Sequence, residues 1–464
     1  MSESMRALQP IWHGAGLPPA SLANLSLGGA EPVLPSSFAV GTAAQTTLAA
    51  AALAGAELGQ HRNGVRQQVR VDMRHAALEC CCRFTIDGRM PEVWDKIAGL
   101  YRCADDGWVR LHTNFAHHRD GVLRLLGLPA GPDTPRETVA AALQDWRAPA
   151  FEDAAAHAGL VVAALRRFDE WDAHPQSAAV ARDPLVAIEK IGEAAPLALP
   201  PLPLAARPLD GLRVLDLTRI LAGPVGGRTL AAYGADVLLV NAPHLPNIEA
   251  IIDTSRGKLS ALADLRSAEG RKGLLAVLRG AHVFIQGYRP GALAALGFAR
   301  EAVAHARPGI VMVSLSAYGE SGPWAGRRGF DSLVQTATGL NHAEAQAAGS
   351  DQPKALPMQI LDMATGFLMA FGAQAAVLRQ QREGGSWHVR VSLARTAQWL
   401  RELGRVAGGF AGPAADFTGL MEPHACGYGE LLALRHAAVF SHTPAGWTRP
   451  SMRPGSHPLA WPTA

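Results

Sequence analysis

The sequence predicts an α/β protein built around a parallel β-sheet, with a second, smaller α+β lobe interlocked with it. Two observations support this prediction. Strand and helix patterns alternate along the second half of the chain, and a helix–turn–strand unit occurs in both halves. A chain of 464 residues is also long enough for two or three domains, each with its own core.

The alternation begins at residues 213–217, whose apolar run is typical of a buried strand. Gly223-Pro224 then opens a predicted helix, and residues 235–240 have the composition of the next strand. The pattern continues with a helix, a strand, a helix and a strand, at residues 271–279, 283–285, 301–306 and 310–315. Such alternation predicts a Rossmann-like parallel sheet with helices on its faces.

A repeat relates the two halves of the chain. Residues 43–71 and 363–391 align without a gap at an offset of 320. Each copy has an Ala-rich helix, an Arg-x-Gly turn and the strand sequence Val-Arg-Val. Alanine-rich helices match easily by chance, but the shared turn and strand at one register do not, so we expect two equivalent structural units.

A proline-rich segment separates the two halves. Residues 196–208 contain five prolines and no periodicity, which is typical of an extended linker. We therefore expect a first lobe over residues 1–195, containing one copy of the repeat and a small-domain-like part. A Rossmann-like lobe over 209–400 and a C-terminal tail over 401–464 that packs back follow the linker.

Composition excludes several classes of function. The net charge is +3 and the basic residues are scattered, so no nucleic-acid partner is expected. No uninterrupted apolar run of about 18 residues and no signal peptide are present, so we expect a cytoplasmic protein without a membrane partner. Three of the five cysteines are consecutive at positions 80–82, which favours neither a disulfide framework nor a metal site.

The second half carries a series of short motifs in a fixed order. They include Leu-Asp-Leu-Thr-Arg-Ile-Leu-Ala-Gly-Pro at 215–224 and further motifs at 233–237, 256–258, 288–291, 296–298, 317–324, 329–331, 362–366 and 389–393. In this order and spacing they resemble the class III CoA-transferases, also called the CaiB/BaiF family. Residues 106–109, 170–171 and 174–176 resemble later segments of the same family, which implies a rearranged or partly duplicated member.

The resemblance implies an enzyme that moves coenzyme A between an acyl-CoA and a carboxylic acid, with no permanently bound cofactor. It identifies Asp362 as the catalytic aspartate and implies a homodimer, because the family forms interlocked dimers. By position it also implies the following CoA contacts: Arg219, Ile220, Leu221, Ala222, Arg289, Leu296 and Arg328. Arginine and a turn before a helix N-terminus suit phosphate binding.

Asp362 lies just before an apolar helix, where an Asp also serves as an ordinary N-cap. The functional interpretation uses the same place, since a helix N-terminus is expected to keep the carboxylate ionised and accessible. Gly366, one turn later, is expected to let a thioester approach closely. The resemblance implies an aspartyl anhydride followed by an aspartyl-CoA thioester. The repeat places Thr42 at the equivalent position, which predicts one chemical centre per chain.

Other functions stay open from the sequence. The same family includes acyl-CoA racemases with a Gly-His-Asp motif, but here that motif is Gly329-Phe330-Asp331, and Phe cannot exchange a proton. A CoA-binding protein without catalytic activity is the second alternative. A nicotinamide-dependent enzyme is disfavoured, because residues 222–228 lack the G-x-G-x-x-G pattern.

Overall fold

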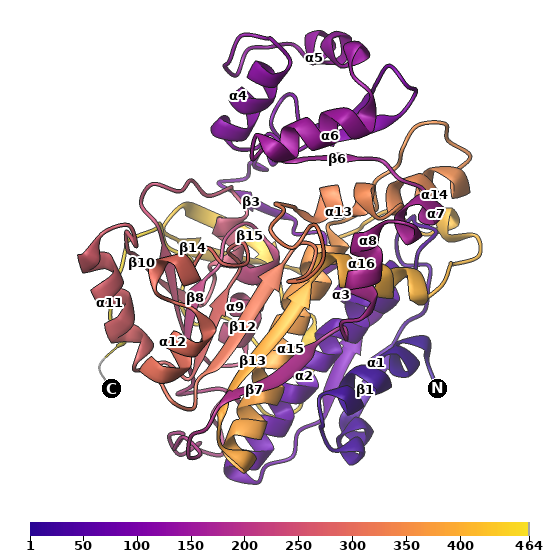
Figure 1. The fold of residues 1–464 in the computed structure, drawn as a ribbon. Helices are drawn as coiled ribbons and strands as arrows, with labels where there is room; N and C mark the ends of the chain where they lie inside the picture. The colour runs from indigo at the N-terminus through magenta and orange to yellow at the C-terminus, as the bar shows by residue number, and fades with distance from the viewer. Residues whose placement is uncertain (463–464) are drawn as a thin grey trace.

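A seven-stranded β-sheet organises the second half of the chain in the computed structural model, which describes residues 1–462 (Figure 1). Its strand order is β10-β9-β8-β11-β12-β13-β7, and all pairs are parallel except β13 with β7. The strands are β7 (Ala187–Gly192), β8 (Arg213–Leu217), β9 (Asp236–Asn241), β10 (Lys258–Leu262), β11 (Val283–Gln286), β12 (Val311–Ser316) and β13 (Ser386–Ser392). This sheet confirms the predicted Rossmann-like lobe.

Helices cover both faces of the sheet, because successive strand residues point to opposite sides. Val214 of β8 belongs to the main hydrophobic core, whereas its neighbour Leu215 belongs to a second core. The helices that follow the strands are α9 (Ala222–Ala232), α10 (Ile251–Thr254), α11 (Ala268–Leu278) and α12 (Arg300–Ala306). The continuous apolar strands in the sequence therefore reflect burial on both faces.

Strand β8 marks the point where the order of the sheet reverses. It pairs with β9 on one side and with β11 on the other, so the chain leaves the carboxyl ends of these strands in opposite directions. A crevice at such a point is the usual ligand site of an open parallel sheet.

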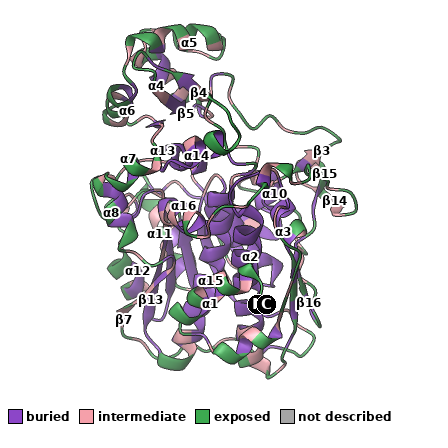
Figure 2. Ribbon diagram, turned by 90° about the vertical axis from the view of Figure 1, so that its right-hand side faces the viewer, coloured by how far each residue is buried: buried purple, intermediate pink, exposed green. Residues whose placement is uncertain are grey.

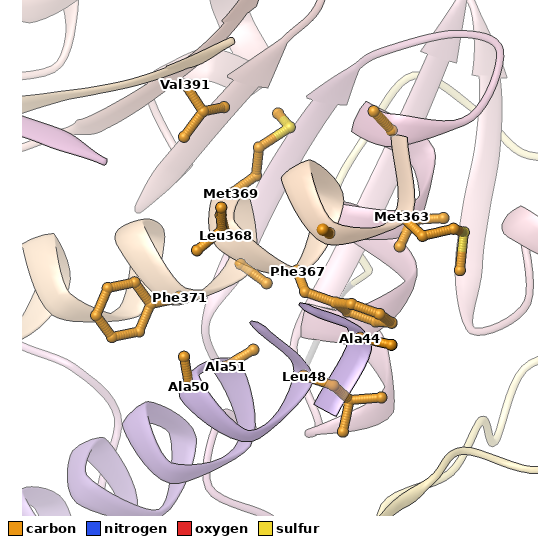
Figure 3. Packing of buried hydrophobic residues seen from close by; sticks show 14 of the residues in the cluster. Ala44, Leu48, Ala50, Ala51, Met363, Phe367, Leu368, Met369, Phe371 and Val391 are labelled. Carbon is orange, nitrogen blue, oxygen red and sulfur yellow. The ribbon is translucent and has the colours of Figure 1, made fainter. Parts of the chain in front are cut away.

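The two copies of the repeat form two long helices that pack against each other. Helix α2 (Val40–Asn63) and helix α15 (Ile360–Glu383) each have 24 residues, and their bounds differ by the predicted offset. Phe367 and Phe371 of α15 lie beside the small side chains of α2 (Figure 3). Gln374 of α15 also donates a hydrogen bond to the carbonyl of Ala51 at 3.0 Å.

Helix α15 is long and apolar enough to cross a membrane by composition alone, yet all of its most apolar 18-residue window is buried inside the protein. Figure 2 shows α15 and α2 as buried elements at the centre of the molecule. Their apolar character is therefore explained by their position in the core.

The two halves exchange strands. Strand β7 comes from the first half but pairs antiparallel with β13 of the second. In return, β16 (Ala438–Phe440) near the C-terminus pairs antiparallel with β2 (Val69–Asp72) of the first half, which pairs in parallel with β1 (Leu25–Gly28). The order β1-β2-β16 thus reproduces the order β12-β13-β7, and the exchange interlocks the two halves.

The proline-rich segment has no helix or strand between residues 193 and 212. It is held against the ends of the two long helices. Arg62 of α2 donates hydrogen bonds to the carbonyls of Pro200 and Pro208, and Gln381 of α15 donates to the carbonyl of Leu197. One hydrophobic core includes residues from both sides of this segment, so the predicted sequence boundaries do not separate the main core into two.

A smaller lobe, at the top of Figure 1, has a core of its own. Its antiparallel sheet consists of β4 (Gly99–Arg102), β5 (Trp108–Leu111) and β6 (Val162–Ala164), with helices α4 (Ala116–Leu125), α5 (Arg136–Ala142) and α6 (Ala148–His157). This lobe confirms the predicted α+β part.

The remaining elements surround the two long helices and the small lobe. They are α1 (Glu3–Gly14), α3 (Met73–Glu79), α7 (Phe168–Asp172), α8 (Pro175–Ala181), α13 (Asp331–Ala337), α14 (Leu340–Ala347), α16 (Leu393–Glu402), β3 (Phe84–Ile86), β14 (Met421–Cys426) and β15 (Gly429–Leu434), with short 3₁₀ turns at Pro19–Asn24, Leu143–Asp145, Ala294–Leu296 and Gly409–Ala411. Strands β14, β15 and β3 form an antiparallel sheet that joins the C-terminal segment to the first half.

A fragment of residues 208–464 is expected to be poorly soluble. It loses β7 and exposes the face of α15 that packs on α2, and each buried Leu or Phe that becomes exposed costs roughly 2 kcal/mol. Co-expression with residues 1–207 should restore a soluble complex, as measured by size-exclusion chromatography. A monodisperse and correctly folded 208–464 fragment would contradict this account.

Candidate active site

A cavity of about 340 Å³ lies at the carboxyl ends of β8 and β11, beneath the small lobe. The turn after β8, the loop after β11 and the loop before α13 supply one part of its wall. The small lobe supplies another part through Phe115, His117 and His118. Asp362 of α15 lines the same cavity, so residues distant in the sequence meet at the switch point of the sheet.

Most of the predicted site residues meet in this cavity. Asp362 is joined there by residues of the turn after β8 and by two arginines from separate loops: Arg219, Ile220, Leu221, Ala222, Arg289 and Arg328. Leu296 does not line the cavity. It packs instead against the core on the α11 and α12 side of the sheet, and its role as a CoA contact stays a prediction.

Asp362 is the third residue of α15, and Gln359 occupies the N-cap position. The N-cap interpretation of Asp362 is therefore wrong. Its backbone N–H donates a hydrogen bond of 3.0 Å to Oδ2 of Asp331, which acts as the capping carboxylate. The side chain of Asp362 is free of capping and lies at the cavity wall, although the residue is only 7% exposed.

Asp331, the first residue of α13, is a functional candidate that the sequence reasoning missed. Its carboxylate also accepts a hydrogen bond from Nε2 of Gln335, whose Oε1 accepts from Nδ2 of Asn341 at 3.0 Å. This buried network fixes Asp331 against the start of α15. The motif Gly329-Phe330-Asp331 contains this residue, but the sequence does not show that its carboxylate caps α15.

The charge of the carboxyl pair differs from the prediction. Burial raises the pKa of Asp362 well above its usual range, and the nearby negative charge of Asp331 raises it further. Burial likewise raises the pKa of Asp331 to about 6, although hydrogen bonds to its carboxylate oppose this effect. The helix N-terminus therefore does not hold the pKa of Asp362 low, and a charge on either carboxyl disfavours ionisation of the other.

In the first copy of the repeat a carboxylate also caps the N-terminus of the long helix, but no aspartate lies at the position equivalent to Asp362. Oε1 of Glu31 accepts a hydrogen bond of 2.7 Å from the backbone N–H of Thr42, just as Asp331 accepts from Asp362. Glu31 and Asp331 are thus equivalent caps of α2 and α15. Thr42 is buried and does not line the cavity. Of the two equivalent residues, Asp362 alone places a carboxyl group at the cavity wall.

Phe330 occupies the place of the racemase histidine and stacks on an imidazole from the small lobe. The ring centroids of Phe330 and His112 are 4.0 Å apart with an interplanar angle of 23°. Burial, with a smaller contribution from Arg110, lowers the pKa of His112 to about 3. His112 is neutral at ordinary pH and does not line the cavity, so it does not replace the missing histidine.

The cavity carries positive charge at its wall. Among residues 1–462, the guanidinium groups of Arg219, Arg289 and Arg328 have no acidic side chain as an ion-pair partner. Arg219 donates to the carbonyl of Pro246, and Arg328 donates to Nε2 of His118 at 3.2 Å. Unpaired arginines in a half-buried cavity favour an anionic ligand.

Gly366 faces away from the cavity. A Cβ atom at this position would lie 2.5 Å from the carbonyl oxygen of Ala222 and 2.8 Å from Val225. The equivalent atom at Gly226 would lie 3.1 Å from the carbonyl oxygen of Gly366. The prediction that Gly366 admits the thioester is therefore wrong, and its absent side chain lets α9 cross α15 closely.

Comparison with known proteins identifies relatives of this chain among CoA-transferases. Residues 209–429 match the sequence model of CoA-transferase family III. An acyl-CoA transferase of Gibberella moniliformis is 31% identical over 375 residues, which cover 72% of this chain and 66% of the relative. A succinate–glutarate CoA-transferase of Agrobacterium fabrum is 31% identical over 205 residues, which cover 40% of this chain and 51% of the relative.

The crystal structure of a CAIB/BAIF family protein from Brucella suis is 26% identical, covers 48% of this chain and 65% of that chain, and superposes with a TM-score of 0.39. The chain thus spans between about half and two thirds of the length of these relatives.

The parallel sheet and the cavity at its switch point define an α/β protein with an arginine-lined cavity. The chain belongs to CoA-transferase family III, which confirms the resemblance carried by the motifs. The rearrangement or partial duplication of the chain stays a prediction.

Replacing Asp331 with Asn should lower the pKa of Asp362, because it removes the adjacent negative charge that disfavours ionisation. The amide introduced at position 331 keeps an oxygen that can accept from the N–H of Asp362. Difference infrared titration against an Asp362→Asn reference would measure the carboxyl ionisation. An unchanged or raised midpoint would contradict the electrostatic coupling of the pair.

Proposed function

We propose that the protein transfers CoA between an acyl-CoA and a carboxylic acid, with Asp362 as the nucleophile. The carrying observation is the charge distribution of the cavity. Among the described residues that line it, Asp362 alone has a carboxyl group, whereas the other charged side chains are arginines. A single carboxylate facing an anion-binding wall suits covalent transfer of an acyl group from an anionic thioester.

Asp362 reacts in its ionised form, which burial and the charge of Asp331 make less favourable. In the first half of the reaction, a carboxylate oxygen of ionised Asp362 attacks the carbonyl carbon of the acyl-CoA. The C–S bond breaks, CoA leaves as a thiolate, and a mixed anhydride forms. The thiolate then attacks the Asp362 carbonyl of that anhydride. The donor acid leaves as a carboxylate, and Asp362 carries CoA as a thioester.

In the second half, the acceptor carboxylate attacks the aspartyl-CoA carbonyl and releases the CoA thiolate again. The thiolate attacks the acceptor carbonyl of the new anhydride, which forms the product acyl-CoA and regenerates the Asp362 carboxylate. The four steps balance without a redox reagent or a net proton. A cavity that retains the thiolate between steps would make each attack effectively intramolecular.

The walls of the cavity suit the two ends of an acyl-CoA. Arg219, Arg289 and Arg328 suit the phosphates, and the turn before α9 suits a pyrophosphate at a helix N-terminus. The apolar residues Leu315, Ala317 and Leu393 line the same cavity and suit the acyl chain. Relatives named as acyl-CoA and succinate–glutarate CoA-transferases support this substrate class.

Two other functions compete with this proposal. A racemase of this kind needs a proton-transfer group at the position of Phe330. The cavity wall has an aromatic ring at that position, with His112 behind it, and the histidines that do line the cavity, His117 and His118, come from the small lobe. A non-catalytic CoA-binding protein would need the arginines but not Asp362. A cytoplasmic location and assembly as a homodimer stay predictions from the sequence.

Asp362→Asn should abolish CoA exchange while leaving CoA binding within about threefold of the wild-type value. The amide preserves the shape of the side chain and the backbone N–H bond to Asp331, but it is a poor nucleophile. Exchange between an acyl-CoA and a panel of carboxylic acids would be followed by mass spectrometry, and CoA binding by calorimetry.

Thr42→Ala is the matched control, because it changes the equivalent residue of α2 outside the cavity and should leave exchange nearly unchanged. Residual exchange above about one part in ten thousand in Asp362→Asn would contradict a nucleophilic role.

A further inference from the structure

The turn between β8 and α9 contains a backbone conformation that its sequence disfavours. Ile220 has φ of +76°, in the left-handed region that β-branched residues rarely adopt. Its neighbours Arg219, Leu221 and Ala222 line the cavity with it. A strained residue at a ligand site persists only where the surrounding structure holds it.

A buried lysine from a different strand holds both ends of this turn. Nζ of Lys258, on β10, donates a hydrogen bond of 2.8 Å to Oδ2 of Asp216 at the end of β8. It also donates at 2.8 Å to the carbonyl of Pro224 in the first turn of α9. The Lys258 and Asp216 side chains are both 0% exposed.

The second oxygen of Asp216 extends this contact into the turn. Oδ1 accepts hydrogen bonds from both the backbone N–H, at 3.0 Å, and the hydroxyl of Thr218, two residues before Ile220. The strained residue is therefore flanked by fixed groups at Thr218 and at Pro224. We call the set Asp216, Thr218, Pro224 and Lys258 the turn clamp.

Two glycines of α9 leave space for the turn clamp. A Cβ atom on Gly223 would lie 2.5 Å from Cβ of Thr218, and one on Gly227 would lie 2.3 Å from Oδ2 of Asp216. These glycines explain the glycine-rich sequence of α9, which lacks the dinucleotide-binding pattern. Their function is close packing on the turn clamp, while Gly226 between them serves the crossing with α15.

We propose that Lys258 is a positioning residue for the CoA-binding turn, which it holds through Asp216 and Pro224 in the conformation that accepts the ligand. The inference rests on the proposed function for the identity of the ligand. Lys258 does not line the cavity, so it acts through the turn and not by contact.

The chemistry of the pair supports a positioning role over a purely stabilising one. Burial lowers the pKa of Lys258, while the charge of Asp216 opposes that shift. A buried ion pair is often no more stabilising than apolar residues of the same volume. An ammonium group, however, can bridge a side chain and a carbonyl on separate elements, which an apolar side chain cannot do.

The test is the double variant Asp216→Asn/Lys258→Met, which removes both charges together and leaves no unpaired buried ion. The amide introduced at position 216 can still accept from Thr218, but the link from β10 to α9 is lost. We expect a folded protein whose CoA dissociation constant and KM rise about tenfold while kcat changes less than about threefold. Hydrogen exchange at residues 217–222 should accelerate, as measured by mass spectrometry.

A matched control changes another fully buried hydrogen-bonded pair, Glu79→Gln/His436→Gln, in which both side chains are 1% exposed and neither lines the cavity. It should affect thermal stability without changing CoA binding or exchange in 217–222. Unchanged hydrogen exchange and CoA affinity in the folded test variant would overturn the inference, as would equal effects in the control.

The same measurements distinguish failure of the transferase proposal from failure of the positioning proposal. A wild-type protein that binds CoA without exchanging it would contradict the transferase proposal, while a loss of CoA affinity and turn protection in the test variant would still support the positioning role. If the wild type binds no CoA, the inference is overturned as a statement about CoA, whatever the hydrogen exchange shows.

Discussion

The close crossing of α9 and α15 sets the geometry of the site. Both helices contribute a glycine, Gly226 and Gly366, at positions where an added Cβ would collide with the other helix. Helix α15 carries Asp362 one turn before this crossing, and α9 begins at the turn that lines the cavity. The contact therefore sets the distance between the proposed nucleophile and the proposed nucleotide-binding turn. Because the two helices cross in the close-packed interior, they have little room to shift, and the distance stays fixed.

The side of α15 opposite α9 is buried by elements of the first half of the chain. Helix α2 covers it, while β7 and β16 are exchanged between the two sheets that flank the pair. The two copies share a capped helix N-terminus, with Glu31 serving α2 and Asp331 serving α15. The cap is thus a structural feature of the repeat. Asp362 adds a second carboxyl beside it in one copy, where burial raises the pKa of Asp362 and repulsion from Asp331 raises it further. In the first copy Thr42 occupies the equivalent position, so this second carboxyl group is absent there.

Patterns local in the sequence predicted the fold well. The strands were visible because residues buried on both faces are continuously apolar, as in β8 and β12, and the repeat revealed α2 and α15 with their shared register. The exchange of β7 and β16 was not visible in detail, because hydrogen bonding between distant strands leaves little trace in either segment. The turn at Arg219–Ala222 was located from its position between a strand and a helix. The left-handed conformation of Ile220 and the hydrogen bond from Lys258 of β10 to Asp216 are not contained in any local pattern.

The errors at the site have the same origin. Gly366 was assigned by its spacing from Asp362 and Leu296 by the family resemblance, but the direction of each residue relative to α9 and to the sheet decides what it contacts. The ionisation of Asp362 was inferred from the helix alone, whereas burial and the charge of Asp331 outweigh the helix N-terminus. His112 behind Phe330 belongs to the small lobe and could not be placed without the fold.

The proposed function requires that the carboxyl group of Asp362 become acylated during turnover. The most direct measurement is incubation with an acyl-CoA and hydroxylamine, followed by peptide mass spectrometry. Hydroxylamine converts an aspartyl anhydride or thioester to a stable hydroxamate. The account predicts a hydroxamate on Asp362 that requires the acyl-CoA and is absent from Asp331 and Glu31. An exchanging protein without this modification at Asp362, or with it at another residue, would contradict the account.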